Sequence, residues 1–140
     1  MPQQIREVMT TDLRTLNPDA TLTEAARVMR DAGIGDVLLV GDDGSLTGMV
    51  TDRDIVVRAL AEGRDPNTCS LRDVSSGDLV TVSPDTDATE AVELMSRHAV
   101  RRLPVVEGGK PVGVVSIGDL AIERDSDSAL ADISAAPGNN

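Results

Sequence analysis

Two short segments of the chain carry the residues best suited to bind a ligand. The segment GMVTDRD places Thr51 three positions before Asp54, and GVVSIGD places Ser116 three positions before Asp119. Each pair follows an apolar run and precedes a helical pattern, where a hydroxyl and a carboxylate at this spacing form a capping box. The same groups suit a nucleotide: a helix start and its hydroxyl bind phosphate, and the carboxylate accepts from the ribose hydroxyls. Both interpretations remain open from the residues alone.

The two segments belong to an internal repeat that spans most of the chain. IREVMTTDLRTLNPDATLTEAARVM aligns with LRDVSSGDLVTVSPDTDATEAVELM at an offset of 66 residues, as Arg6 aligns with Arg72. The offset falls to 65 after the turns GDDGS and GGK, so Thr51 aligns with Ser116. We predict one copy over residues 1–66, a second over 67–125, and a flexible tail over 126–140.

Each copy predicts the same order of elements, β-α-β-β-α. A short strand and a Pro-Asp turn precede a helix, with capping residues Thr21 and Glu24 in the first copy and Asp87 and Glu90 in the second. Gly33 suits the C-terminal end of the first helix. A hairpin follows, with a tight Asp-Gly turn in the first copy, and then a second helix. One copy is too small to close a core alone. We therefore expect an α/β (α+β) fold of two repeats packed sheet to sheet with pseudo-twofold symmetry and a cleft between them.

Composition excludes several classes of function. The chain of 140 residues has a net charge of −11 and no aromatic residue, and its Lys and Arg side chains form no cluster, which argues against nucleic-acid binding. The single cysteine, Cys69, forms no internal disulfide, and no run is long enough for a membrane span. We therefore expect a cytoplasmic protein that does not contact membranes. No nucleophile and base or paired acids stand out as a catalytic set.

These repeats resemble tandem CBS domains, often called a Bateman module. The resemblance rests on the MT-type start, the helix that ends near a methionine, the LPVV strand and the GxV(T/S)xxD motif, and it covers about residues 5 to 125. GMVTDRDIVVRALAEGRDPNT is similar to the small stand-alone bacterial members, including the hypoxic-response type. The resemblance implies a regulatory module that binds an adenosine-containing ligand and pairs into a dimer. It also implies that Thr51, Asp54, Ser116 and Asp119 contact the ligand.

The resemblance adds three arginines to the candidate site. HAVRRLPVV places Arg101 and Arg102 where family members often carry an arginine that contacts phosphate, whereas the first copy has Gly35 and Asp36 there. Arg53, within TDRD, is a further candidate, and each of these cations could instead form a surface ion pair.

The isolated His98 and Cys69 have no companions at metal-ligand spacing, so we expect no metal site. We predict a non-enzymatic sensor, with no cofactor beyond a regulatory ligand such as AMP, ADP or ATP. The alternative is a ligand-free dimerisation or protein-interaction module. A homodimer is expected, and any signal would leave through a separate effector protein. The first helices of the two copies are expected to supply the dimer face as well as core contacts.

Overall fold

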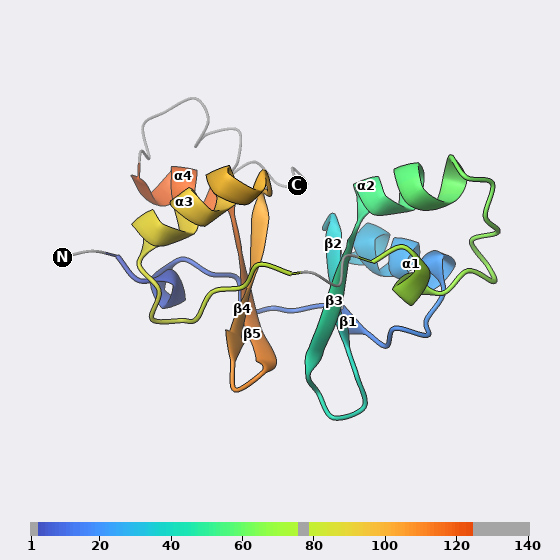
Figure 1. Cartoon of the computed structure of the whole chain (residues 1–140), viewed down its shortest axis with the longest axis horizontal. Helices are drawn as coiled ribbons and strands as arrows, with labels where there is room; N and C mark the ends of the chain where they lie inside the picture. The colour runs from blue at the N-terminus through green and yellow to red at the C-terminus, as the bar shows by residue number, and fades with distance from the viewer. Residues whose placement is uncertain (1–2, 76–78, 125–140) are drawn as a thin grey trace. The chain divides into compact units, whose positions relative to one another are not determined.

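The protein is described by a computed structural model that covers residues 3–75 and 79–124, with side chains described as far as residue 120 (Figure 1). The tail predicted over 126–140 lies outside the described residues. The elements in chain order are η1 (Ile5–Glu7), β1 (Thr15–Leu16), α1 (Leu22–Ala32), β2 (Asp36–Val40), β3 (Leu46–Thr51), α2 (Asp52–Asp54), η2 (Ile55–Leu60), η3 (Leu71–Asp73), α3 (Ala88–His98), β4 (Arg102–Glu107), β5 (Lys110–Ser116) and α4 (Ile117–Arg124). The expected mixture of helices and sheets is confirmed.

The chain divides into two compact units that do not coincide with the two sequence copies. Among the described residues, the first unit comprises 14–75 and 79, and the second combines 3–13 with 80–124. Residues 3–13 therefore belong with the second copy, and the start of the second copy belongs with the first.

The first unit is built on a three-stranded sheet in the order β1-β2-β3. β1 runs parallel to β2, and β2 pairs antiparallel with β3 through the predicted hairpin. The helices α1 and α2 lie on the same side of this sheet (Figure 1). α1 buries Leu22, Ala25 and Met29. As predicted, Thr21 caps it by accepting from the Glu24 amide at 3.2 Å, and Gly33 ends it at a positive φ of 67°.

The start of the second copy completes this unit. The amide of Leu71 donates to the carbonyl of Ala20 at 2.8 Å, and that of Arg72 donates to the carbonyl of Pro18 at 3.0 Å. Leu71 and Val74 are buried in the same core cluster as the α1 residues. Each such side chain contributes about 1.5–3 kcal/mol when fully buried, so η3 is part of the core of the first unit.

The second unit contains the hairpin β4-β5 together with α3 and α4. Val82 forms a single parallel bridge to Val105, at the place where β1 pairs with β2 in the first unit. The short strand that the sequence predicted over 79–82 is therefore reduced to one bridge. Ala99 ends α3 at φ 54°, where the first unit has Gly33. A left-handed residue with a Cβ is disfavoured, so the second unit carries local strain that the first unit avoids.

The N-terminal segment completes the second unit in the same way. The amide of Ile5 donates to the carbonyl of Thr86 at 2.9 Å, and that of Arg6 donates to the carbonyl of Pro84 at 3.0 Å. These bonds are the counterparts of those made by Leu71 and Arg72, shifted by the 66-residue offset. Thus η1 of the first copy packs in the second unit, and η3 of the second copy packs in the first unit.

One predicted capping box does not form. Asp87 makes no side-chain bond at the start of α3, so the prediction that Asp87 and Glu90 form a capping box is wrong. The amide of Ala88 donates to the carbonyl of Gln3 at 2.7 Å, as the amide of Leu22 donates to the carbonyl of Cys69 at 3.2 Å in the first unit. Both helices therefore receive a backbone acceptor from the exchanged segment at their first amide.

The second helix of the first copy differs from the predicted one. After the single turn α2, residues Ile55–Leu60 form a π-helix, and the amide of Ala61 donates to the carbonyl of Val56 at 2.9 Å. In the second unit α4 is an α-helix throughout. Short π segments occur often at functional sites. The two copies therefore differ immediately after the shared motif.

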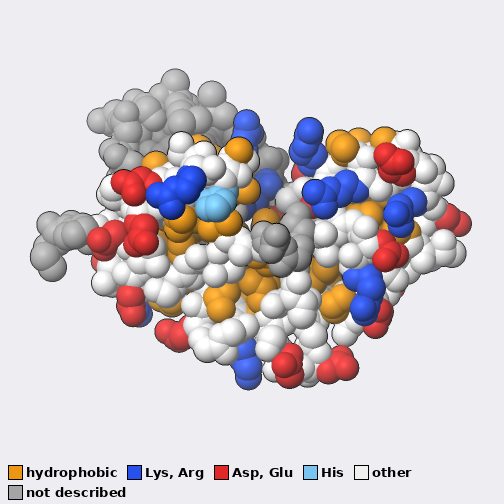
Figure 2. Space-filling model, in the orientation of Figure 1, with side chains coloured by type: hydrophobic (Ala, Val, Ile, Leu, Met, Phe, Trp, Pro, Cys, Tyr) orange, Lys and Arg blue, Asp and Glu red, His pale blue; other side chains and the backbone are white. Residues whose placement is uncertain are grey.

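Exposed apolar side chains lie on the second helices and not on the first ones. Among the described residues the exposed large hydrophobic side chains are Val56, Val57, Leu60 and Ile117. Three of them lie on η2, where Figure 2 shows orange side chains along the top of the first unit. In α1 and α3, Leu22, Met29 and Met95 are buried in the cores. No large hydrophobic side chain of α1 or α3 is exposed, and the expectation that the first helices supply the dimer face stays a prediction.

Candidate ligand site

Both copies of the hydroxyl-carboxylate motif are capping boxes at a strand-to-helix junction. In the first unit Thr51 Oγ1 accepts from the Asp54 amide at 3.1 Å, and the Thr51 amide donates to Asp54 Oδ2 at 2.9 Å. In the second unit Ser116 Oγ accepts from the Asp119 amide at 3.1 Å, and the Ser116 amide donates to Asp119 Oδ2 at 2.9 Å. The capping interpretation is confirmed, and it fixes both carboxylates in position.

Capping leaves chemical capacity for a ligand. An ionised carboxylate has two oxygens with about four acceptor positions, and the box uses one oxygen of each aspartate. The hydroxyls of Thr51 and Ser116 each accept one bond and still have a proton to donate. Asp54 and Asp119 are both partly exposed. Each motif can therefore accept hydrogen bonds from a vicinal diol while it remains a cap.

The glycine of the second motif is required by a close approach of the chain. A Cβ at Gly113 would lie 2.7 Å from Met9 Sδ and 3.1 Å from the carbonyl oxygen of Thr10. Thr10 and Val114 pair in both directions, with N–O distances of 2.8 and 3.0 Å. The glycine of GVVSIGD thus admits the exchanged N-terminal segment beside the strand that ends at Ser116.

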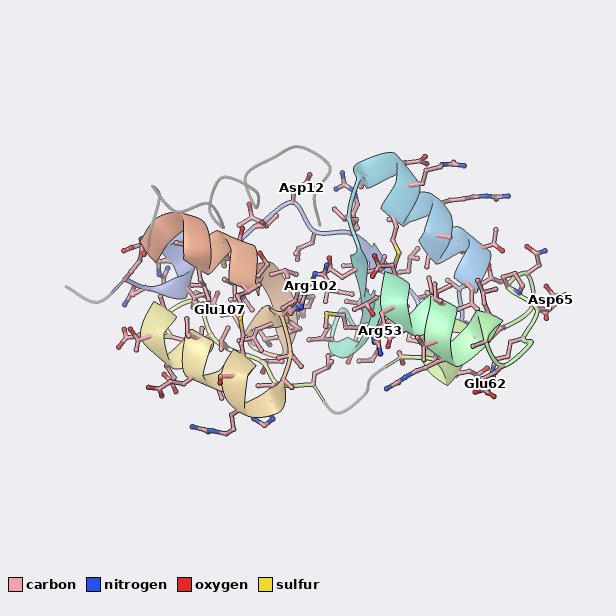
Figure 3. The ribbon with its side chains drawn as sticks, turned by 90° about the horizontal axis from the view of Figure 1, so that it is seen from above. Asp12, Arg53, Glu62, Asp65, Arg102 and Glu107 are labelled. Atoms are coloured by element: carbon pink, nitrogen blue, oxygen red, sulfur yellow. The ribbon has the colours of Figure 1, made fainter. Side chains whose placement is uncertain are left out.

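The arginines of the second copy lie beside its motif. Arg102 is the cross-strand partner of Ser116, and the carbonyl of Arg101 accepts from the amide of Ile117 at 2.8 Å. Figure 3 shows Arg102 near the N-terminal end of α4. Arg101 is exposed and Arg102 is half-buried. A cation therefore lies next to the Ser116–Asp119 pair, as the sequence predicted, and its role toward phosphate stays a prediction.

The first copy has an acid at the corresponding place. Asp36 is the cross-strand partner of Thr51, and the carbonyl of Gly35 accepts from the amide of Asp52 at 3.0 Å. Arg53 is exposed at the start of α2 (Figure 3), and its amide donates to Asp52 Oδ1 at 2.8 Å. The local charge around the two motifs is therefore different.

Arg58 is a residue at this site that the sequence reasoning missed. Its Nε lies 3.7 Å from Asp54 Oδ1, and its Nη1 donates to the carbonyl of Val74 at 3.4 Å. The signal was present as the i, i+4 spacing of Asp54 and Arg58 in DIVVR. The guanidinium therefore faces the carboxylate oxygen that the capping box does not use.

Other classes of site find no support among the described residues. No group of three or more His, Cys, Asp and Glu side chains is placed to hold a metal ion within residues 3–75 and 79–120. Cys69 is buried in the core of the first unit, and His98 is exposed at the end of α3. No helix in the described part of the chain is long and apolar enough to cross a membrane.

Comparison with known sequences shows the family. The sequence profile of the CBS domain matches residues 5–60 and 71–125. The chain is 40% identical over 134 residues to the CBS domain-containing protein YhcV of Bacillus subtilis, covering 93% of this chain and 94% of that protein. It is 38% identical over 116 residues to Hypoxic response protein 1 of Mycobacterium tuberculosis, covering 83% of this chain and 81% of that protein.

Comparison with solved structures shows the same fold as in known CBS domain pairs. The CBS domain pair of protein MJ0100, solved with 5′-methylthioadenosine and S-adenosyl-L-methionine, superposes with a TM-score of 0.82. The match covers 91% of this chain and 100% of that one, and at 21% identity it supports the fold alone. The resemblance to the small hypoxic-response type is confirmed by the sequence match above. With two profile matches over most of its length and close relatives of the same size, this chain belongs to the CBS domain family, as a tandem pair of CBS domains.

Proposed function

We propose that the protein is a non-enzymatic regulatory module that binds an adenosine-containing ligand through its two hydroxyl-carboxylate motifs. In each copy the aspartate accepts hydrogen bonds from the ribose hydroxyls. The threonine or serine hydroxyl contacts the first polar group beyond the ribose. The observation that carries this proposal is the geometry of Asp119. Its Oδ2 is fixed by the Ser116 amide at 2.9 Å, which aims the partly exposed carboxylate without using up its acceptor capacity.

The charge beside the second motif favours a phosphorylated compound there. Arg102 is the cross-strand neighbour of Ser116, and Arg101 precedes it in the chain. A guanidinium forms strong charge-assisted bonds with phosphate. The proposed ligand class is therefore an adenine nucleotide such as AMP, ADP or ATP. The MJ0100 domain pair, which shares this fold, was solved with two adenosine compounds.

A thermal-shift screen tests this proposal. AMP, ADP, ATP, NAD, S-adenosylmethionine and adenosine are each added to the purified protein at millimolar concentration. A ligand at a hundred times its Kd stabilises the fold by about 2.7 kcal/mol, which raises Tm by several degrees for a chain of this size. If none of these compounds raises Tm, the ligand-free interaction module becomes the better description.

The signal is proposed to pass through assembly and a separate cytoplasmic effector protein. The exposed Val56, Val57 and Leu60 form one apolar face on η2, and covering it with a second copy of the chain would give a homodimer. Removing apolar surface from water stabilises such a contact by about 25 cal/mol per Å² before the costs of association. A CBS-CP12 protein of cyanobacteria, 28% identical to this chain, is hexameric, and this example supports the proposal of assembly.

A further inference from the structure

An arginine faces the Asp54 oxygen that the capping box leaves. At Asp54 this oxygen, Oδ1, lies 3.7 Å from Arg58 Nε. The Arg58 guanidinium is also bonded to the carbonyl of Val74 at 3.4 Å, and Val74 is buried in the core of the same unit. Two acceptors on different segments therefore hold one flexible cation beside Asp54.

The second copy carries an acidic residue at the sequence position that aligns with Arg58. Four residues after Asp119 the chain has Glu123, where the first copy has Arg58. Among the side chains described through residue 120, Asp119 is hydrogen-bonded to Ser116 in the capping box. The cation that faces Asp54 therefore has no counterpart in the sequence of the second copy at that spacing.

We propose that Arg58 is a specificity-determining residue that competes with the ribose for Asp54, so that adenosine ligands bind more tightly at Ser116–Asp119 than at Thr51–Asp54. This inference rests on the proposed function and adds to it an internal competitor at one of the two motifs. A diol that approaches Asp54 must share Oδ1 with the guanidinium or displace it from both Asp54 and the Val74 carbonyl. The second copy has no arginine at the position aligned with Arg58.

The expected effect is modest because Arg58 is half exposed. Its side chain is 53% exposed and that of Asp54 is 15% exposed. Exposed ion pairs at this spacing are weak, so their loss changes an affinity about two- to fivefold. The competition is also screened by salt, whereas the hydrogen bonds of an uncharged ligand are not. The dependence of adenosine affinity on salt is therefore a second readout of the competition.

The experiment uses the full chain and the uncharged ligand adenosine, with AMP beside it. Asp119→Asn leaves the first motif as the intact one, and Arg58→Gln is added to that variant. Calorimetry is expected to show adenosine affinity rising about two- to fivefold on Arg58→Gln. Added salt should raise adenosine affinity in Asp119→Asn and leave it unchanged when Arg58→Gln is also present. The control is Arg30→Gln, which removes the same charge from an arginine that pairs with Asp31 on α1. This variant should change neither the adenosine affinity nor its dependence on salt.

The outcomes separate this inference from the proposed function. If the unaltered chain binds neither adenosine nor AMP, the proposed function is lost and this inference with it. If the chain binds and Arg58→Gln leaves adenosine affinity unchanged or lowers it, the inference alone is wrong. A loss of AMP affinity with adenosine affinity unchanged would identify Arg58 as a phosphate contact and also overturn the competition.

Discussion

The amide of Leu71 donates a hydrogen bond to the carbonyl of Ala20 at 2.8 Å, although the two residues belong to different copies of the repeat. The counterpart bond joins Ile5 to Thr86 at 2.9 Å in the other unit. Each compact unit therefore contains the first turn of the other copy. A sequence copy and a folding unit are different pieces of this chain.

A pair of fragments tests this exchange. Residues 14–75 contain the first compact unit with η3, whereas residues 1–66 contain the first sequence copy without it. We expect 14–75 to be the more stable fragment, because 1–66 lacks the buried Leu71 and Val74. Each of these side chains contributes about 1.5–3 kcal/mol. Circular dichroism during urea unfolding measures the difference, and equal or greater stability of 1–66 would contradict the exchange.

The left-handed residue that ends α3 gives a second prediction. Ala99 has φ 54° and is exposed. Ala99→Gly should stabilise the chain by about 0.5–1 kcal/mol, because glycine adopts this conformation without a steric penalty. Gly33→Ala at the matching position, where φ is 67°, should destabilise it by a similar amount. Chemical denaturation measures the free energy of unfolding of both variants, and we expect it to rise for Ala99→Gly and to fall for Gly33→Ala. A less stable Ala99→Gly protein would show that the Cβ of Ala99 is favourable here.

Local sequence patterns predicted the local features of the site well. The three-residue spacing of Thr51 and Asp54 predicted the capping box, because both groups belong to one turn of chain. The candidate Arg102 came from the family resemblance, and the structure makes it the cross-strand partner of Ser116.

Features that depend on distant segments were not predictable in this way. The bond from the Ala88 amide to the carbonyl of Gln3 joins segments that are 85 residues apart, and no local pattern predicted it. The repeat alignment shows that two segments are alike and does not show which unit each segment joins. The π-helix after Asp54 has no simple sequence signature, and the bond of Arg58 to the Val74 carbonyl required the structure.

The exposed apolar face of η2 leads to a prediction about assembly. Leu60 is 54% exposed, and Leu60→Glu would place a charge within the face formed with Val56 and Val57. We expect the unaltered chain to scatter light as a dimer of twice 14.7 kDa and Leu60→Glu to scatter as a monomer at tens of micromolar. Burying an unpaired charge costs far more than one such contact gains.

The matched control for assembly is Ala26→Glu, which adds the same charge at an exposed position of α1. This variant should remain dimeric. A dimer that survives Leu60→Glu and dissociates with Ala26→Glu would place the interface on the first helix, as the sequence pattern had indicated. A monomeric unaltered chain would contradict the homodimer itself.

Calorimetric titration of Asp119→Asn with AMP, together with its melting point, tests the ribose-binding role of the motif most directly. Asparagine keeps the size and a capping oxygen for the Ser116 amide, so the free energy of unfolding should fall by only a few tenths of a kcal/mol. The ribose loses a charged acceptor worth about 1.5–3 kcal/mol, so AMP affinity at this motif should fall roughly ten- to a hundredfold. Full AMP affinity combined with a clear loss of stability would show that Ser116 and Asp119 form a helix cap and nothing more.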